Sequence, residues 1–257
     1  MVQRQVTEGG QEIWFEPSPK WVRVMFGGQF IADSKRVYLL RPGGPPYYYF
    51  PKEDVRMDLL QPTSHTERSP VLGEASYWTV KVGDKAAENA AWTYPNPVSE
   101  TFDLSGYVAF VWREMDDWFE EAEPVYVHAR DPHKRIDILS STRRVVVNIG
   151  GVTVAESHNP SLLFEGGHPI RYYMSKLDVR MDLLIPSDKA TICPYKGDAR
   201  YYSVKVDGKI YPDIAWYYSI PTAESLKIAG LLCFFNERVD VLYLDGVEQP
   251  KPKTRWP

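Results

Sequence analysis

The sequence predicts an all-β protein made of two tandem domains, each built from small antiparallel sheets with one short helix. The first observation is an internal repeat, because the heptapeptide DVRMDLL occurs at both 54–60 and 178–184. The second is that short alternating segments separated by glycine turns fill most of the chain. The third is that helical patterns are confined to two short segments, 99–104 and 222–229.

The heptapeptide anchors a repeat that extends over most of the chain. Downstream of it the two copies match at an offset of 124 residues, and upstream the offset is 123. One residue is therefore gained in a loop, where an insertion is tolerated, and not inside a strand, where it would invert the side chains. We expect a first repeat within residues 1–130 and a second within 131–257, joined by the charged segment 121–135. The identities include Gly73 with Gly197, Tyr77 with Tyr201, Trp92 with Trp216, Tyr94 with Tyr218, and Phe110 with Phe234.

Glycine pairs mark a predicted β-hairpin in each repeat. Strands at 22–26 and 29–33 flank Gly27 and Gly28, and strands at 144–149 and 152–156 flank the second pair. Two consecutive glycines supply the positive φ angles that a tight hairpin turn needs. Further strands are expected at 201–206, 214–218, 231–235 and 239–244. The acidic run 116–121 is interpreted as a solvated edge.

Composition excludes several classes of function. The net charge is −4 and no long Lys/Arg run is present, so we expect no nucleic-acid partner. No segment has the apolar length of a membrane span and the N-terminus lacks a signal core, so we expect no membrane association and a cytoplasmic location. Two cysteines, Cys193 and Cys233, do not make a disulfide scaffold. The aromatic content of 14% is high and suits both cores and pockets.

Three motifs together resemble a known family. They are DVRMDLL, the loop CPYKG at 193–197, and Ala215-Trp216 followed by Tyr218. The chain resembles the domain of unknown function 427 family in its tandem form, over nearly its whole length. That family is similar to the β-tent superfamily, in which two small antiparallel sheets lean together over a cleft. Relatives with that fold include methionine sulfoxide reductases of the B type and the thalidomide-binding domain of cereblon.

The resemblance implies a fold and almost no function. Some classifications give the family a nucleotidyltransferase label, but the chain has no glycine-rich phosphate loop and no metal-carboxylate motif. Several β-tent relatives hold zinc through two Cys-x-x-Cys pairs, and this chain has none. Its five histidines are scattered without ligand spacing. We therefore expect neither a metal nor a cofactor.

The second repeat keeps a loop that the first has lost. Cys193 and Lys196 correspond to Ser69 and Leu72, so a site built on them would exist once per chain. Lys196 could stabilise a thiolate on Cys193, or it could hold an anionic ligand. Alternatively, the loop is a structural turn with a buried thiol and a solvated lysine. Cys233, inside an apolar strand, is expected to be core.

The heptapeptide also has two interpretations. In an extended strand Asp178, Arg180 and Asp182 share one face. An arginine flanked by carboxylates could orient a ligand carboxylate or phosphate. The alternative is an internal ion-pair network, which the presence of the motif in both copies favours.

These residues lead to three hypotheses. The first is a small-molecule-binding protein with a cleft in the second repeat. The second is a thiol-dependent enzyme, acting by redox or acyl transfer through Cys193, although no histidine partner is evident. The third is an interaction module in which the repeats pack on each other as an intramolecular pseudo-dimer. The ligand-binding residues predicted for the cleft are Arg180, Asp182, Thr191, Lys196, Tyr202, Trp216 and Tyr218.

Overall fold

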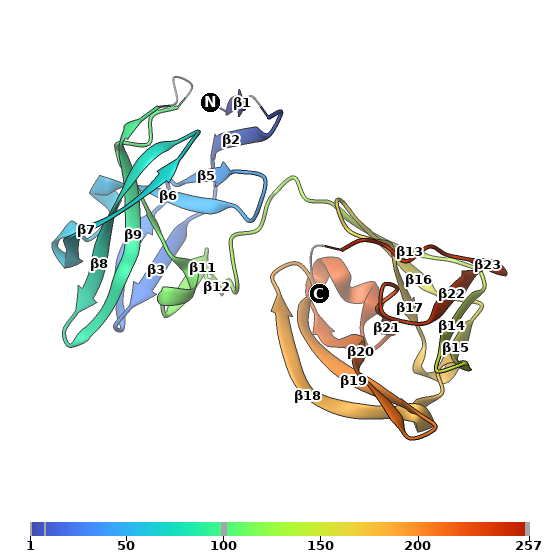
Figure 1. The fold of residues 1–257 in the computed structure, drawn as a ribbon. Helices are drawn as coiled ribbons and strands as arrows, with labels where there is room; N and C mark the ends of the chain where they lie inside the picture. The colour runs from blue at the N-terminus through green and yellow to red at the C-terminus, as the bar shows by residue number, and fades with distance from the viewer. Residues whose placement is uncertain (1, 8, 99–101, 255–257) are drawn as a thin grey trace. The chain divides into compact units, whose positions relative to one another are not determined.

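A computed structural model describes residues 2–7, 9–98 and 102–254 of the chain (Figure 1). The chain forms two compact units, Met1–Asp131 and Pro132–Pro257. Each unit contains one large and one small antiparallel sheet. The described helices are short 3-10 turns, of which the longest is η6 (Ala223–Ile228). The predicted all-β class is therefore confirmed.

No helix among the described residues combines the length and the apolar character needed to cross a membrane.

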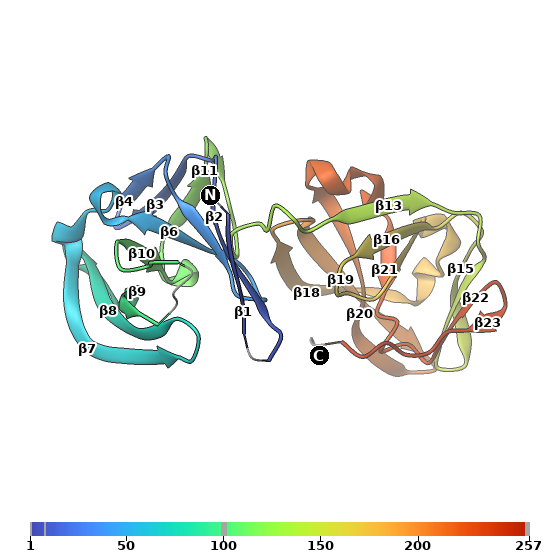
Figure 2. The same ribbon diagram turned by 90° about the horizontal axis from the view of Figure 1, so that it is seen from above.

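The first unit pairs an eight-stranded sheet with a four-stranded one. The large sheet has the order β1-β2-β5-β6-β10-β9-β8-β7, and the small sheet has the order β12-β11-β3-β4. Strands β7 and β8 curve strongly at one end of the large sheet (Figure 2). The large sheet comprises β1 (Gln3–Val6), β2 (Glu12–Pro17), β5 (Tyr38–Arg41), β6 (Tyr47–Pro51), β7 (Leu60–Ser69), β8 (Gly73–Val82), β9 (Lys85–Pro97) and β10 (Tyr107–Phe110). The small sheet comprises β3 (Val22–Phe26), β4 (Gln29–Ser34), β11 (Asp117–Glu120) and β12 (Glu123–Pro124).

The second unit repeats this topology without a counterpart of β1. Its seven-stranded sheet has the order β13-β16-β17-β21-β20-β19-β18, and its small sheet has the order β15-β14-β22-β23. The large sheet comprises β13 (Ile136–Ser140), β16 (Ser161–Glu165), β17 (Arg171–Met174), β18 (Leu184–Cys193), β19 (Gly197–Val206), β20 (Lys209–Pro221) and β21 (Leu232–Phe234). The small sheet comprises β14 (Val145–Ile149), β15 (Val152–Ser157), β22 (Val241–Leu244) and β23 (Val247–Glu248).

Each large sheet buries apolar side chains on both of its faces. One face packs against the small sheet, in a buried cluster that includes Val24 and Phe50 in the first repeat and Val147 and Phe234 in the second. The opposite face is rich in aromatic side chains, and we call it the aromatic face. In the first repeat it contains Phe15, Tyr38, Tyr49, Tyr77, Trp92, Tyr94 and Tyr107. In the second it contains Tyr173, Tyr201, Trp216, Tyr218 and Phe235.

A buried hydrogen bond lies at the centre of each aromatic face. The Trp92 indole Nε1–H donates to the Tyr49 hydroxyl at 3.1 Å, and Trp216 donates to Tyr173 at 3.2 Å. The two rings of each pair meet edge to face, at 89° and 85°. A buried indole N–H without a partner costs about 1–3 kcal/mol, so this pairing allows tryptophan to occupy a closed apolar site.

Both predicted glycine hairpins are confirmed. Gly27 and Gly28 have φ angles of 58° and 73°, and β3 pairs with β4 across them. The Gly27 N–H donates to Asp116 at 2.7 Å, and the equivalent Gly150 N–H donates to Asp240 at 2.6 Å. A carboxylate therefore fixes the turn at the same place in both repeats.

Several local predictions were wrong. The heptapeptide is not an extended strand, because in each copy only its valine and its last leucine pair with a neighbouring strand, and a 3-10 turn lies between those two residues. The 3-10 turns of this region are η1 (Lys52–Asp54), η2 (Met57–Leu59), η4 (Lys176–Asp178) and η5 (Met181–Leu183). The acidic run 116–121 is not simply a solvated edge, since it contains β11, in which Trp118 and Glu120 are buried. Glu120 accepts a hydrogen bond from the Tyr48 hydroxyl at 2.8 Å, which accounts for a buried carboxylate there.

The predicted helices differ between the repeats. The segment 222–229 contains η6, which is a 3-10 helix. Residues 99–101 of the segment 99–104 lie outside the described residues, and Phe102–Leu104 are not helical. A further 3-10 turn, η3 (Trp112–Glu114), follows β10.

The hairpin glycines allow a matched test of backbone strain. A Cβ on Gly27 would lie 2.7 Å from the Val82 Cβ, whereas a Cβ on Gly28 would meet nothing within 4 Å. We expect Gly28→Ala to cost about 1 kcal/mol through its φ angle alone, and Gly27→Ala about 2–3 kcal/mol because overpacking adds to the strain. Urea unfolding followed by tryptophan fluorescence measures both. Equal losses in the two variants would contradict the close approach to Val82.

Candidate functional site

Five of the predicted site residues lie on the two faces of the large sheet of the second repeat. Cys193, Trp216 and Tyr218 belong to the aromatic face. Thr191 joins them, because its hydroxyl lies 2.8 Å from the hydroxyl of Tyr201. Tyr202 packs on the other face, against the core between the sheets. The structure therefore brings four of the predicted residues to one surface and places Tyr202 away from them.

Arg180 and Asp182 form a separate, exposed ion pair. Arg180 Nε and Nη2 donate to Asp182 at 2.8 and 2.6 Å, and both side chains are more than half exposed. The hydrogen bonds from Arg180 hold the pKa of Asp182 below its ordinary value. The pair precedes β18, whereas Cys193 ends that ten-residue strand, so about 30 Å of chain separates them. Arg56 and Asp58 repeat the pair in the first repeat, and Asp178 instead accepts a hydrogen bond from the Ser157 hydroxyl at 2.6 Å.

The ammonium group of Lys196 is engaged by a carboxylate that sequence reasoning missed. Lys196 Nζ lies 2.5 Å from Glu165 Oε2, and Lys134 Nζ lies 2.6 Å from Glu165 Oε1. His168 Nε2 is 3.7 Å from the same carboxylate, whose side chain is only 6% exposed. Burial raises the pKa of Glu165, but the charges and hydrogen bonds of the two lysines outweigh burial and leave that pKa below its ordinary value. Lys196 therefore has a partner other than a thiolate.

The position of Glu165 explains why it was missed. It ends β16, next to the loop in which the second copy gains a residue. The repeat comparison offers no counterpart there, and Lys134 lies in the segment that was interpreted as a linker. The spacing of Lys134, Glu165 and Lys196 along the chain does not indicate that they are in contact, because only the order of the strands brings them together.

The two cysteines occupy different environments. Cys193 is half-buried and packs against the aromatic face, where burial raises the pKa of Tyr218 well above its ordinary value. Cys233 is fully buried on β21, and burial raises the pKa of its thiol to about 12. Both are free thiols, and Cys233 lies in the core as expected.

Within residues 2–7, 9–98 and 102–254, no three His, Cys, Asp or Glu side chains are placed so that they could hold a metal ion.

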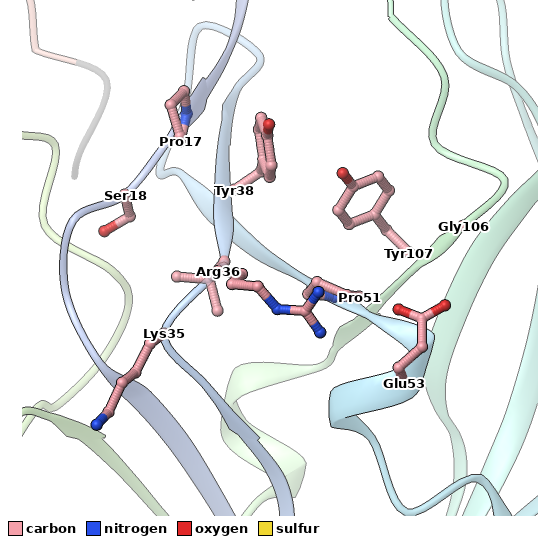
Figure 3. Close-up of a pocket in the computed structure, with 10 residues that line it drawn as sticks. Pro17, Ser18, Lys35, Arg36, Tyr38, Pro51, Glu53, Gly106 and Tyr107 are labelled. Carbon is pink, nitrogen blue, oxygen red and sulfur yellow. The ribbon is translucent and has the colours of Figure 1, made fainter. Parts of the chain in front are cut away.

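A large pocket lies in the first repeat and was not predicted from the sequence. It has a volume of about 570 Å³ and is formed by β2, β5 and β6, the turn after β4 and the start of β10 (Figure 3). Tyr38 and Tyr107 contribute aromatic walls with ring centroids 5.3 Å apart, and Tyr38 also stacks on Phe15 at 4.6 Å. Lys35, Arg36 and Glu53 contribute charges of both signs at the rim.

The charged groups of this pocket differ in orientation. In Figure 3 the Arg36 guanidinium, the Glu53 carboxylate and the Tyr107 ring face a common space, whereas the Lys35 ammonium points away from them. Arg36 is held from behind by Asp54, which accepts from Nε at 3.3 Å and from Nη2 at 2.7 Å. Asp54 in turn accepts from the Ser34 hydroxyl at 2.6 Å. These hydrogen bonds fix the orientation of the Arg36 guanidinium.

A smaller pocket of about 310 Å³ lies in the second repeat, between β13 and η6. Its walls include the exposed side chains of Leu139 and Leu226. Lys227 Nζ crosses it to donate to the Ile138 carbonyl oxygen at 3.1 Å. Neither this pocket nor the larger one is lined by any of the residues predicted for the site.

A family model described as a domain of unknown function, number 427, matches the chain twice, over residues 14–121 and 137–245. The two matches cover most of the chain and coincide with the two repeats. No curated protein matches the chain.

The contrast between the cysteines predicts that native protein has one titratable thiol. We expect a disulfide reagent such as Ellman's reagent to modify Cys193 only, and to modify Cys233 only after unfolding, because a buried thiol with a high pKa is neither accessible nor ionised. Cys193→Ser should leave native protein unreactive. Rapid modification of two thiols in the native protein, or of one thiol in native Cys193→Ser, would contradict this assignment.

The Glu165 cluster predicts acid sensitivity in the second repeat. A lowered folded pKa means that Glu165 contributes stability above its ordinary pKa of 4.5, and that this contribution is lost as the pH falls through the folded value. Burial also lowers the pKa of His168, so protonation of this residue in the unfolded chain reduces stability below pH 6.5.

Glu165→Gln tests this coupling. We expect it to destabilise the second repeat by about 2 kcal/mol at neutral pH, because two partly buried lysines lose their counter-charge, and to flatten the loss of stability below pH 4.5. Hydrogen exchange measured by mass spectrometry on peptides from 132–254 follows this repeat alone. An unchanged acid profile would show that Glu165 does not carry the effect.

Proposed function

Since this chain belongs to the domain of unknown function 427 family, whose description names no activity, we propose its function from the geometry alone: the first repeat binds a small molecule. The observation that carries the proposal is the pocket of about 570 Å³ that Tyr38 and Tyr107 line. Its volume falls within the range of about 300–1,000 Å³ that small-molecule sites occupy.

The lining indicates the chemistry of the ligand. Tyrosine rings offer apolar surface together with hydroxyl groups, which suits a planar or apolar group with polar substituents. Arg36 is exposed, and its Nη1 takes no part in the pairing with Asp54, so it is suited to an anionic or carbonyl oxygen. Glu53 on the facing side favours a donor or a positive charge. A small polar molecule with groups of both kinds fits these walls.

The repeat comparison supports a role confined to the first copy. The counterparts of Tyr38 and Tyr107 are Ser161 and Leu231. Lys35, Arg36 and Glu53 correspond to His158, Asn159 and Leu177. The fold does not depend on these five side chains, because the two large sheets have the same strand order apart from β1. The scaffold does not require these side chains, which leaves ligand binding as a reason for their presence.

Replacing two pocket tyrosines by their counterparts from the second repeat tests the proposal. We expect the double variant Tyr38→Ser, Tyr107→Leu to abolish the thermal shift that a metabolite screen finds with the natural chain, because both aromatic walls are lost. Tyr126→Leu, at an exposed tyrosine outside the pocket, is the matched control and should keep the response. A ligand that still binds the double variant, or a broad screen without any ligand, would contradict this function.

A thiol-dependent activity of the second repeat is the second candidate. It is favoured by one observation, that the half-buried Cys193 lies on the aromatic face beside Tyr218. The pairing of Lys196 with Glu165 removes the cation that was expected to activate the thiol. The pH dependence of the Cys193 alkylation rate tests this candidate. A rate that rises only near the pKa of an ordinary free thiol would exclude a thiol-dependent activity.

A further inference from the structure

The pocket of the first repeat holds two opposite charges that face each other without pairing. In Figure 3 the Arg36 guanidinium and the Glu53 carboxylate point into the same space. The hydrogen bond and the charge of Asp54 raise the pKa of Arg36, and the nearby charge of Glu53 adds to that rise. Among the described residues, however, Arg36 is paired only with Asp54, and no cation lies within 4.0 Å of Glu53. Both side chains line the cavity, so the space that they face is open to a ligand.

Both charged groups keep hydrogen-bonding capacity for a ligand. Arg36 donates to Asp54 through Nε and Nη2, so its Nη1 is not used in that pair. Glu53 is exposed, and its carboxylate oxygens can accept from a donor in the cavity. Hydrogen bonds between charged groups are about twice as strong as those between neutral groups. A ligand with a single charge would use one of these groups and leave the other unpaired.

The second repeat lacks both charges at once. Asn159 takes the place of Arg36, and Leu177 takes the place of Glu53. The hydrogen bond from the serine hydroxyl to the aspartate behind this arginine is nevertheless 2.6 Å long in both repeats. The aspartate therefore does not need the arginine as a partner, and the scaffold requires neither charge. The joint loss of the two charged groups is what we expect if they act on one ligand.

We propose that the ligand of this pocket is a zwitterion of the α-amino-acid class with an apolar side chain, whose carboxylate binds Arg36 and whose ammonium group binds Glu53. This assignment rests on the proposed function and narrows the class of its ligand. A zwitterion matches both charges of the pocket with one molecule, and the cavity of about 570 Å³ has room for it. Tyr38, Tyr107 and Pro51 give apolar walls for the side chain of the ligand.

The experiment compares three ligands that share a phenyl ring, and it uses the full chain. L-phenylalanine carries both charges, 3-phenylpropanoate lacks the ammonium group, and phenethylamine lacks the carboxylate. Binding of each ligand is measured by NMR titration of the backbone amide resonances of Tyr38 and Tyr107. L-phenylalanine should bind at least about tenfold more tightly than either analogue, because each analogue lacks one charge-assisted contact. Equal binding of the three ligands, or no binding of L-phenylalanine, would overturn the proposal.

Two variants assign each charge of the ligand to its partner in the pocket. Arg36→Gln should make L-phenylalanine bind no more tightly than phenethylamine, because the carboxylate has lost its partner. Glu53→Gln should instead make L-phenylalanine bind no more tightly than 3-phenylpropanoate. Both side chains are exposed, and Asp54 keeps its serine partner, so folding should be unaffected. Arg113→Gln, at an exposed arginine that does not line the pocket, is the matched control and should keep the full preference.

These measurements distinguish the zwitterion from the proposed function itself. A ligand from the metabolite screen that lacks one of the two charges, and whose binding depends on Tyr38 and Tyr107, would overturn the zwitterion and leave the small-molecule site in place. A preference for L-phenylalanine that persists in Arg36→Gln and in Glu53→Gln would also overturn it. Loss of the preference in these two variants, with unchanged amide spectra elsewhere, is the result that supports the proposal.

Discussion

Each repeat must cover the second apolar face of its large sheet, and this constraint shapes everything else in the molecule. The small sheet covers only one face, so the aromatic face must be closed by other means. The tryptophan at its centre is held by a hydrogen bond to a buried tyrosine in both repeats, so the scaffold of the face is the same. The repeats differ in what they place over that scaffold.

The second repeat closes the face with its own residues. Phe235 fills the space beside Trp216, and Arg171 covers it while forming a two-point ion pair with Glu237 at 2.6 and 2.9 Å. Helix η6 buries Ile228 against the same cluster. The first repeat instead has Val111 and Tyr47 at the positions of Phe235 and Arg171.

The repeat, the all-β class and the glycine hairpins could be predicted because they depend on local patterns and on identities along the chain. The heptapeptide was misinterpreted because an alternation of charged and apolar residues fits a strand as well as two consecutive 3-10 turns. For the site, Cys193, Thr191, Trp216 and Tyr218 lie on one face of the large sheet, whereas Arg180, Asp182 and Tyr202 lie elsewhere. The partner of Lys196 could not be predicted, since Glu165 lies where the copies cannot be aligned. The pocket of Tyr38 and Tyr107 was missed because those residues carry no motif and are brought together only by the pairing of β5, β6 and β10.

The central claim is that the pocket lined by Arg36, Tyr38 and Tyr107 is a ligand site particular to the first repeat. A crystal structure of the full chain grown with a ligand found by the thermal-shift screen tests it most directly. The account predicts density for that ligand beside Tyr38 and Tyr107, and none beside their counterparts Ser161 and Leu231. Density beside Ser161 and Leu231, or at neither place, would contradict it.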